Sequence, residues 1–526
     1  MQKGLYIKQK NDKRIVLKDG LPFSQEKIEK LCDNGQRKEC LIMSSNKGNS
    51  AAAEAKKISA TTLSFMAFST VWGFGNVVNG FAYFNGLQVI FSWIMMFALY
   101  FVPYALMVGE LGSAFKNAGG GVTSWILETS NPKLAYYAGY TYWVVHIPYI
   151  ASKGSGGLKA LAWTFLVNDW YDSLPAWQVQ LATGCVFVFF LWVASRGLQP
   201  LKVLTSLAGT SMFVMSLLYV VMMLAAPAIN PTASFVPLDW SWENLIPQFN
   251  VQYFTSLSIL VFAVGGCEKI SPYVNKVNNP GKDFPKGMIS LAIMVMVCAI
   301  LGTIAMGMMV PPEEIVGEAQ QHFIANGAYI AFQRLGEYYH VGNSLAVVYG
   351  ACNAIGQFST LVLSIDAPLR MLLDDESARQ FVPKGLLKQN KYGAYTNGIL
   401  MIGVLSGSII AVQLLGKGAA DIISWLNKLN SVCMPMRYLW VFLAYILLRS
   451  AVPGKFNSEY VFVKNKAIAV SAGVWCFFVT AACCILGVYV EGDVLRTVLN
   501  IIMPFALLAL GLIMPAIRKA QDAAGK

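Results

Sequence analysis

Apolar residues gather in long runs from residue 58 to the end of the chain. Each run is about 20 residues or longer, the length that a helix needs to cross ~30 Å of hydrocarbon. A transmembrane helix is expected for each run, because a helix satisfies its own backbone hydrogen bonds. We predict twelve such helices, at residues 59–82, 86–108, 134–164, 177–195, 202–226, 249–268, 287–310, 344–369, 394–415, 420–448, 466–488 and 493–516.

Positive charge is distributed unevenly over the polar segments between these runs. With the N-terminus inside, the inner loops and C-terminal tail hold 20 Lys and Arg, among them Lys269, whereas the outer loops hold only Arg334, Lys417 and Arg496. Cytoplasmic loops are enriched in Lys and Arg. The asymmetry favours twelve spans with both termini in the cytoplasm, and the outer loop 311–343 is expected to contain a short helix at 313–334.

Composition agrees with a membrane protein whose apolar surface contacts lipid. Hydrophobic residues make up 56% of the chain and charged residues 13%, against about 25% charged in soluble domains. A net charge of +12 alone would raise the prospect of nucleic-acid binding. The hydropathy pattern argues against that partner, since basic loops account for the charge.

The segments outside the spans are expected to be tails. Residues 1–57 hold 13 Lys and Arg and are expected to form a flexible basic cytoplasmic tail, although Met43 is a second plausible start. Residues 58–516 form the predicted transmembrane domain, and 517–526 a cytoplasmic C-terminal tail. No cleavable signal peptide is expected. The ten scattered cysteines and three histidines lack metal-ligand spacing, so we expect free thiols and neither metal nor cofactor.

Two of the predicted helices are interrupted by glycine. Gly73 and Gly75 lie in the middle of the first, while Gly265 and Gly266 lie near the end of the sixth. Unwound backbone at membrane depth is tolerated where it is buried in protein or lines a cavity. Its free N–H groups attract a carboxylate and its free C=O groups an ammonium, so a zwitterionic amino acid fits. Close helix packing is the alternative explanation, but two related breaks favour a binding site.

Four motifs lie in order on these spans: 73–77 (GFGNV), 110–112 (ELG) with 119–121 (GGG), 266–268 (GCE) with 277–285 (VNNPGKDFP), and 366–370 (DAPLR) with Asp374 and Asp375. With them, residues 58–516 resemble the amino acid–polyamine–organocation superfamily, near its bacterial glutamate/GABA antiporters. The resemblance implies an all-α fold of twelve transmembrane helices, a five-plus-five inverted repeat with two additional C-terminal helices. It also implies alternating access around spans one and six.

The resemblance further implies positions for the substrate. It assigns the α-carboxylate to Gly73, Phe74, Gly75, Asn76 and Val77, and the α-amino group to the carbonyls of Ala263, Val264 and Gly265. Phe262 stands where relatives carry a gating aromatic residue, although it would equally suit a core or lipid-facing position. No lysine stands in the middle of span five, at 208–211, where some relatives replace a sodium ion with one. The oxygens of Thr210 and Ser211 could still ligate an ion, so a sodium role stays open, and the resemblance favours exchange without sodium.

Ionisable residues inside the spans are candidates for gating or coupling. His146 and Lys153 are seven residues apart and share a helix face. Lys153 would either meet a substrate carboxylate or extend to the outer interface. His146 would either sense pH or act as a hydrogen-bonding residue. Glu268 has a structural, gating or proton-coupling role as alternatives.

We therefore expect a monomeric or homodimeric secondary transporter, and not an enzyme, that exchanges an external amino acid for an internal amino acid or amine. Arg437 and Asp366 are expected to be structural partners. A proton-coupled symporter is the main alternative, followed by a polyamine transporter and a transporter-like nutrient sensor. A channel and a membrane enzyme are disfavoured, because no filter-like repeat and no catalytic set is visible in the sequence.

Overall fold

A computed structural model describes residues 58–375, 378–412, 414, 417–452, 454–489 and 494–524. The described part is helical, and its only extended pairings are two isolated bridges, Ile58 with Val277 and Gln389 with Tyr395. The predicted tail 1–57 lies outside the described residues. The all-α prediction is confirmed.

The helices follow the predicted order. Their bounds are α3 Ala60–Val71, α4 Gly75–Tyr83, α5 Val89–Met96, α6 Val102–Ala114, α7 Val122–Thr129, α8 Pro132–Val144, α9 His146–Leu166, α10 Ala176–Ala194, α11 Leu198–Ile229, α12 Trp242–Leu245, α13 Val251–Val264, α14 Pro280–Gly307, α15 Glu318–Tyr338, α16 Ser344–Leu373, α17 Thr396–Val412, α18 Lys417–Ser450, α19 Lys466–Gly487, α20 Val494–Leu510 and α21 Ile513–Ala524. A π-helical turn, η2 Phe97–Phe101, joins α5 to α6, and the 3₁₀ helix η4 Cys267–Lys276 follows α13.

Each predicted span contains helix, and eight helices in the described residues are long and apolar enough to cross a membrane. The chain is therefore a polytopic membrane protein. The expected outer-loop helix is present as α15. Two segments differ from prediction. The third span is divided into α8 and α9, where Pro148 cannot donate a helical hydrogen bond. Helix α21 covers most of the expected tail 517–526, with Arg518 donating to the carbonyls of Arg379 and Val382.

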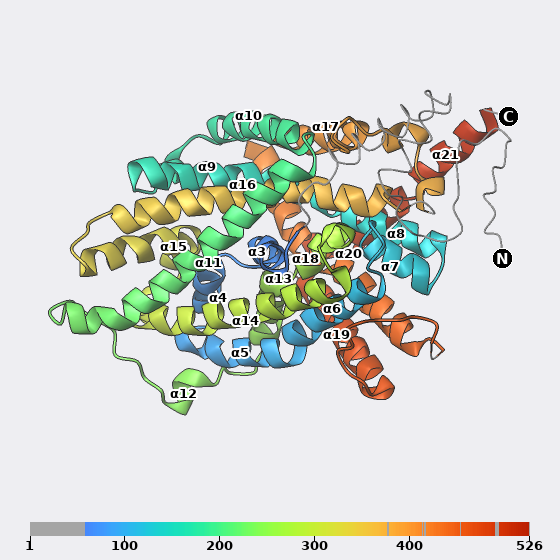
Figure 1. Ribbon diagram of the computed structural model, residues 1–526. Helices are drawn as coiled ribbons and strands as arrows, with labels where there is room; N and C mark the ends of the chain where they lie inside the picture. The colour runs from blue at the N-terminus through green and yellow to red at the C-terminus, as the bar shows by residue number, and fades with distance from the viewer. Residues whose placement is uncertain are drawn as a thin grey trace, which may run out of the picture. The chain divides into compact units, whose positions relative to one another are not determined.

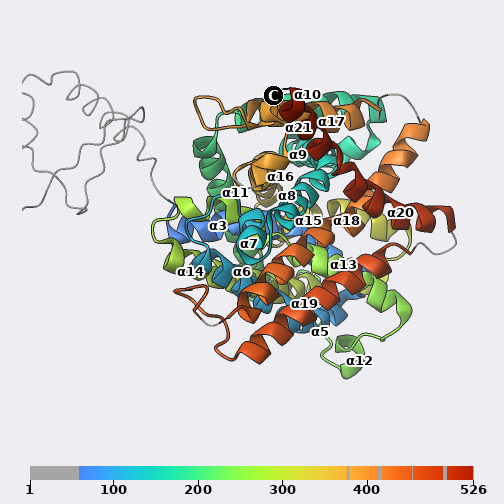
Figure 2. The ribbon, with the colours of Figure 1, turned by 90° about the vertical axis from the view of Figure 1, so that its right-hand side faces the viewer.

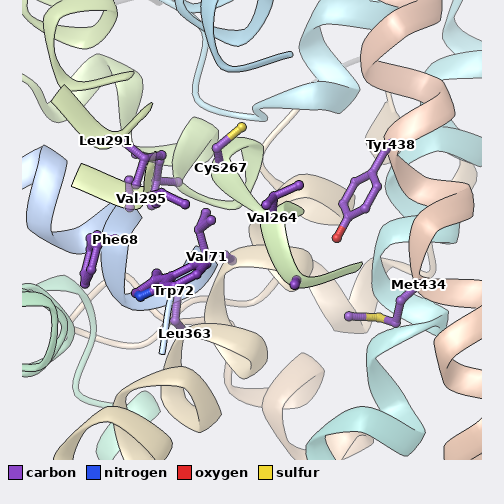
Figure 3. Close-up of a cluster of buried hydrophobic side chains, with 14 of the residues drawn as sticks. Phe68, Val71, Trp72, Val264, Cys267, Leu291, Val295, Leu363, Met434 and Tyr438 are labelled. Atoms are coloured by element: carbon purple, nitrogen blue, oxygen red, sulfur yellow. The ribbon is translucent and has the colours of Figure 1, made fainter. Parts of the chain in front are cut away.

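Helix α3 packs against α11, α14, α16 and η4 (Figure 1). Small residues permit this close packing: a Cβ on Gly209 of α11 would overlap the carbonyl of Phe65, and one on Gly287 of α14 would meet Leu63 at 2.8 Å. Figure 3 shows the apolar cluster that results, with Phe68 and Val71 of α3, Leu291 of α14 and Leu363 of α16 around Trp72. This packing holds the broken helices inside the protein.

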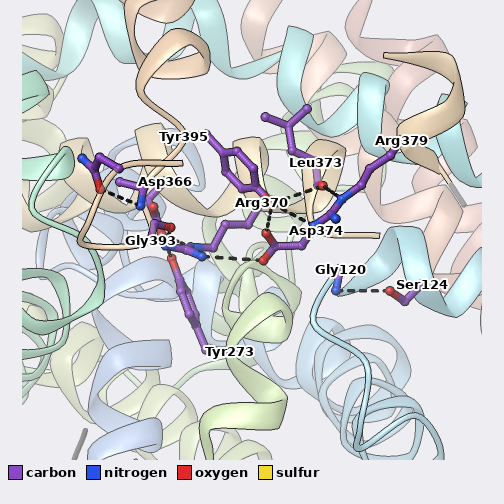
Figure 4. A network of polar contacts seen from close by, with 12 residues as sticks. Gly120, Ser124, Tyr273, Asp366, Arg370, Leu373, Asp374, Arg379, Gly393 and Tyr395 are labelled. Carbon is purple, nitrogen blue, oxygen red and sulfur yellow. Dashed lines mark hydrogen bonds and ion pairs between the residues drawn. The ribbon is translucent and has the colours of Figure 1, made fainter. Parts of the chain in front are cut away.

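A polar network ties η4 to α16 and to the segment before α17 (Figure 4). Tyr273 donates to Asp366 at 2.6 Å, and Arg370 donates to the same carboxylate at 2.7 Å. Tyr395 donates to Asp374 at 2.6 Å, and Arg379 donates to Tyr395 at 3.3 Å. The expected partner role of Asp366 agrees with these contacts.

Candidate functional site

The first predicted break separates α3 from α4. Helix α3 ends at Val71, and α4 begins at Gly75 without a side-chain cap. The first N–H groups of a helix have no partner within it and carry partial positive charge. The start of α4 therefore favours a negatively charged group.

The second break separates α13 from η4. Helix α13 ends at Val264, Gly265 is extended, and Gly266 has φ +115°, a conformation that favours glycine. The last carbonyls of a helix carry partial negative charge, so the end of α13 favours a cation such as an ammonium.

Hydrogen bonds join the two breaks. The Asn76 amide donates to the Val71 carbonyl at 3.4 Å and to the Ala263 carbonyl at 3.2 Å. Thr70 donates to the Gly266 carbonyl at 3.2 Å. Segments almost 190 residues apart in the sequence thus present an α4 N-terminus and an α13 C-terminus to one place.

A cavity of about 410 Å³ opens at this place, within the range of small-molecule sites. Besides the two breaks, its walls come from α9, α11, α15, α16 and α18. Among the predicted site residues, the cavity is lined by Gly73, Phe74, Gly75, Asn76, Ala263, Gly265, Phe262 and Lys153.

The other four predicted residues lie behind the cavity wall. Val77 and Val264 are fully buried apolar side chains, and His146 and Glu268 are fully buried polar ones. Phe74 contributes backbone more than ring to the site. Its ring is fully buried and packs on Tyr219, with ring centroids 4.6 Å apart.

Glu268 and His146 meet at Arg437 of α18, which itself lines the cavity. The Arg437 Nε lies 3.5 Å from Glu268 Oε1, an ion pair without hydrogen-bond geometry. A second guanidinium nitrogen donates to His146 Nε2 at 2.5 Å, and the third to Tyr438 at 3.1 Å. Tyr104 donates to the other Glu268 oxygen. The expected partner role of Arg437 agrees with this arrangement.

These contacts determine the tautomer of His146. Its Nδ1 lies 2.6 Å from the carbonyl of Tyr142, which can only accept, whereas the guanidinium at Nε2 can only donate. The neutral ring with its proton on Nδ1 satisfies both partners. An imidazolium would point a second N–H at Arg437.

Lys269 is a site residue that sequence reasoning missed, because we expected it in a cytoplasmic loop. Its side chain is 3% exposed and lines the cavity. The predicted sixth span ended at Glu268, but η4 continues to Lys276 with Ile270, Tyr273 and Val274 buried. These apolar residues after Glu268 were the available signal.

Comparisons with known proteins agree with this architecture. Residues 58–507 match the amino acid permease family. The chain is 47% identical over 480 residues to the aspartate/glutamate permease AcaP of Lactococcus lactis subsp. cremoris, covering 89% of this chain and 97% of that protein. It is 23% identical over 424 residues to the inner membrane transporter YjeM of Escherichia coli, covering 74% and 81%. It is 25% identical over 271 residues to the polyamine transporter PUT1 of Oryza sativa subsp. japonica, covering 49% and 46%.

Proposed function

This chain belongs to the amino acid permease family, and on that premise we propose that it carries amino acids across the cytoplasmic membrane by alternating access. The observation that carries the proposal is the cavity where the N-terminus of α4 and the C-terminus of α13 converge. A zwitterion has a carboxylate for the first and an ammonium for the second.

The substrate backbone binds across the two breaks. The segment 73–77 at the start of α4 holds the α-carboxylate through the N–H groups of Gly73, Phe74 and Gly75, since those of Asn76 and Val77 already donate to the Gly73 and Phe74 carbonyls. The carbonyls of Ala263, Val264 and Gly265 hold the α-amino group. The Asn76 amide, already bonded to the Ala263 carbonyl at 3.2 Å, keeps the two half-sites in register. Phe262 is half-buried at the wall and covers the bound substrate.

The cavity belongs to an outward-facing arrangement of the transporter. Its lining continues from the breaks to Lys159 of α9 and to Ala325 of α15, which lies in a predicted outer segment. On the opposite side, Tyr273, Asp366 and Arg370 bind η4 to α16. Transport then requires these inner contacts to separate while the outer walls approach each other.

Exchange of an external amino acid for an internal amino acid or amine is our proposed mode, with both termini cytoplasmic. AcaP, a relative named for aspartate and glutamate, makes acidic amino acids the first substrates to test. The similarity to a named polyamine transporter covers about half of the chain. A substrate without a carboxylate would leave the α4 N-terminus unoccupied, so we favour an amino acid as the external substrate.

Counterflow into proteoliposomes tests this proposal. Labelled amino acid should accumulate only in vesicles preloaded with a counter-substrate. Uptake into empty vesicles driven by a proton gradient would contradict exchange and establish symport. If none of the amino acids exchanges or accumulates under either condition, amino acid transport itself is wrong.

A further inference from the structure

Four basic side chains line the cavity, and carboxylates neutralise only two of them within the described residues. Lys159 Nζ lies 2.9 Å from the Asp172 carboxylate, and Arg437 is paired with Glu268. Among the residues that the structure describes, no carboxylate lies within 4.0 Å of Lys153 or Lys269. The wall of the cavity therefore carries an excess of positive charge.

Lys153 and Lys269 contact the same neutral ring. Their ammonium nitrogens lie 4.7 Å and 5.5 Å from the centre of the Tyr149 ring. Lys153 also lies 3.5 Å from the Gln357 amide oxygen, and Lys269 donates to Ser364 at 2.7 Å. An aromatic ring or a neutral hydrogen-bond acceptor stabilises an ammonium less than a neighbouring carboxylate would. A buried cation such as Lys269 is costly until an anion approaches it.

We propose that Lys153 and Lys269, with the ring of Tyr149, form a subsite for the side-chain carboxylate of an acidic amino acid. The inference rests on the proposed function, in which the helix breaks hold the substrate backbone. An acidic amino acid has two carboxylates and one ammonium. The α4 N-terminus binds the α-carboxylate, and the α13 carbonyls bind the ammonium. The side-chain carboxylate is then left to bind the two lysines.

Arg437 is not the primary ligand of that carboxylate. Its three guanidinium nitrogens face His146, Tyr438 and Glu268. Its charge is already balanced by Glu268, so it has less to gain from a substrate anion. The unbalanced charges are those of the two lysines, and they enter from different elements, α9 and η4.

The test compares Lys153→Gln and Lys269→Gln with the unaltered chain. Counterflow of glutamate and of glutamine gives a KM for each. Each variant should lower the glutamate-to-glutamine preference by about tenfold to a hundredfold, the usual effect of a hydrogen bond to a charged group. Lys388→Gln, the same substitution at an exposed inner-loop position, should leave the preference unchanged.

Gln357→Glu provides a second, nearly isosteric test. It places a carboxylate beside Lys153 and should lower the glutamate preference without removing either lysine. Thermal stabilisation by added glutamate, measured in detergent, reads out binding if Lys269→Gln folds but does not transport. If Lys269→Gln does not fold, Lys153→Gln and Gln357→Glu decide the question.

Several outcomes would overturn the subsite. These are an unchanged glutamate preference in the folded variants and a wild-type preference for neutral amino acids. In these cases amino acid transport stands and only the subsite fails. Absence of any amino acid transport by the unaltered chain would refute the proposed function, and the subsite with it.

Discussion

The glycines of this protein differ in how much space a side chain would find beside them. A Cβ on Gly75 would meet no atom within 4 Å, because the residue faces the cavity. A Cβ on Gly157 would overlap the ring of Phe358, and one on Gly265 would overlap the hydroxyl of Tyr438. Only the first kind of position leaves room for a side chain to enter the site without disturbing the packing.

We expect Gly75→Val to abolish transport while the protein remains folded. The isopropyl group would fill the space that the N–H groups of α4 face, and so exclude the substrate carboxylate. Counterflow should fall at least about tenfold, with an unchanged size-exclusion profile in detergent. Gly385→Val, at an exposed position of the 3₁₀ helix Lys384–Leu387 where a Cβ would meet Asn397 only at an ordinary contact distance of 3.9 Å, is the control. Normal uptake by Gly75→Val would remove the first helix break from the binding site.

Glu268 should matter for stability through Arg437. Removing one partner of a buried ion pair leaves an uncompensated charge, at a cost of about 3–5 kcal/mol. Glu268→Gln should therefore lower the free energy of unfolding in detergent strongly. The double variant Glu268→Gln/Arg437→Gln should cost less than the sum of the two single variants. Additive costs would show that the two side chains do not stabilise each other.

At the scale of the helices, the breaks themselves were predictable and their surroundings were not. Gly73, Gly75, Gly265 and Gly266 identify the breaks in the sequence, because glycine is unfavourable inside a helix. The inward position of Lys269 depends on how far η4 continues after the break, and the sequence gives no direct measure of that. The meeting of His146 with Arg437 depends on rotations of α9 and α18, which only packing determines.

Tyr273 links two helical elements, so its hydroxyl should contribute to stability. Tyr273→Phe removes the 2.6 Å hydrogen bond to the buried Asp366 carboxylate and should cost about 1.5–3 kcal/mol. Tyr392→Phe makes the same change at an exposed position, where the hydroxyl accepts from Arg196, and should change stability by less than about 0.5 kcal/mol. Chemical unfolding in micelles measures both. A cost for Tyr273→Phe as small as that of Tyr392→Phe would show that this hydrogen bond of the network in Figure 4 adds no stability.

The twelve apolar runs and the loop charges were sufficient to predict an all-α membrane protein, because lipid restricts a chain to few backbone solutions. The described residues place α12 and α15, from predicted outer segments, toward one end of the bundle, and α7 and α21 toward the other (Figures 1 and 2). The segments expected on one side of the membrane therefore lie together. This separation is what alternation of twelve spans requires.

The uneven distribution of Lys and Arg over the loops predicts which end of the helix bundle faces the cytoplasm. It therefore predicts which loops a reagent outside the cell can label. Ser173 and Lys464 are both exposed, the first in a predicted outer loop and the second in a predicted inner loop. A membrane-impermeant maleimide added to intact cells should label Ser173→Cys above the background of the native cysteines. Lys464→Cys should react only after the cells are permeabilised, because basic loops are retained in the cytoplasm. The reverse pattern would invert the topology, and would make the Lys159 side of the cavity the cytoplasmic entrance.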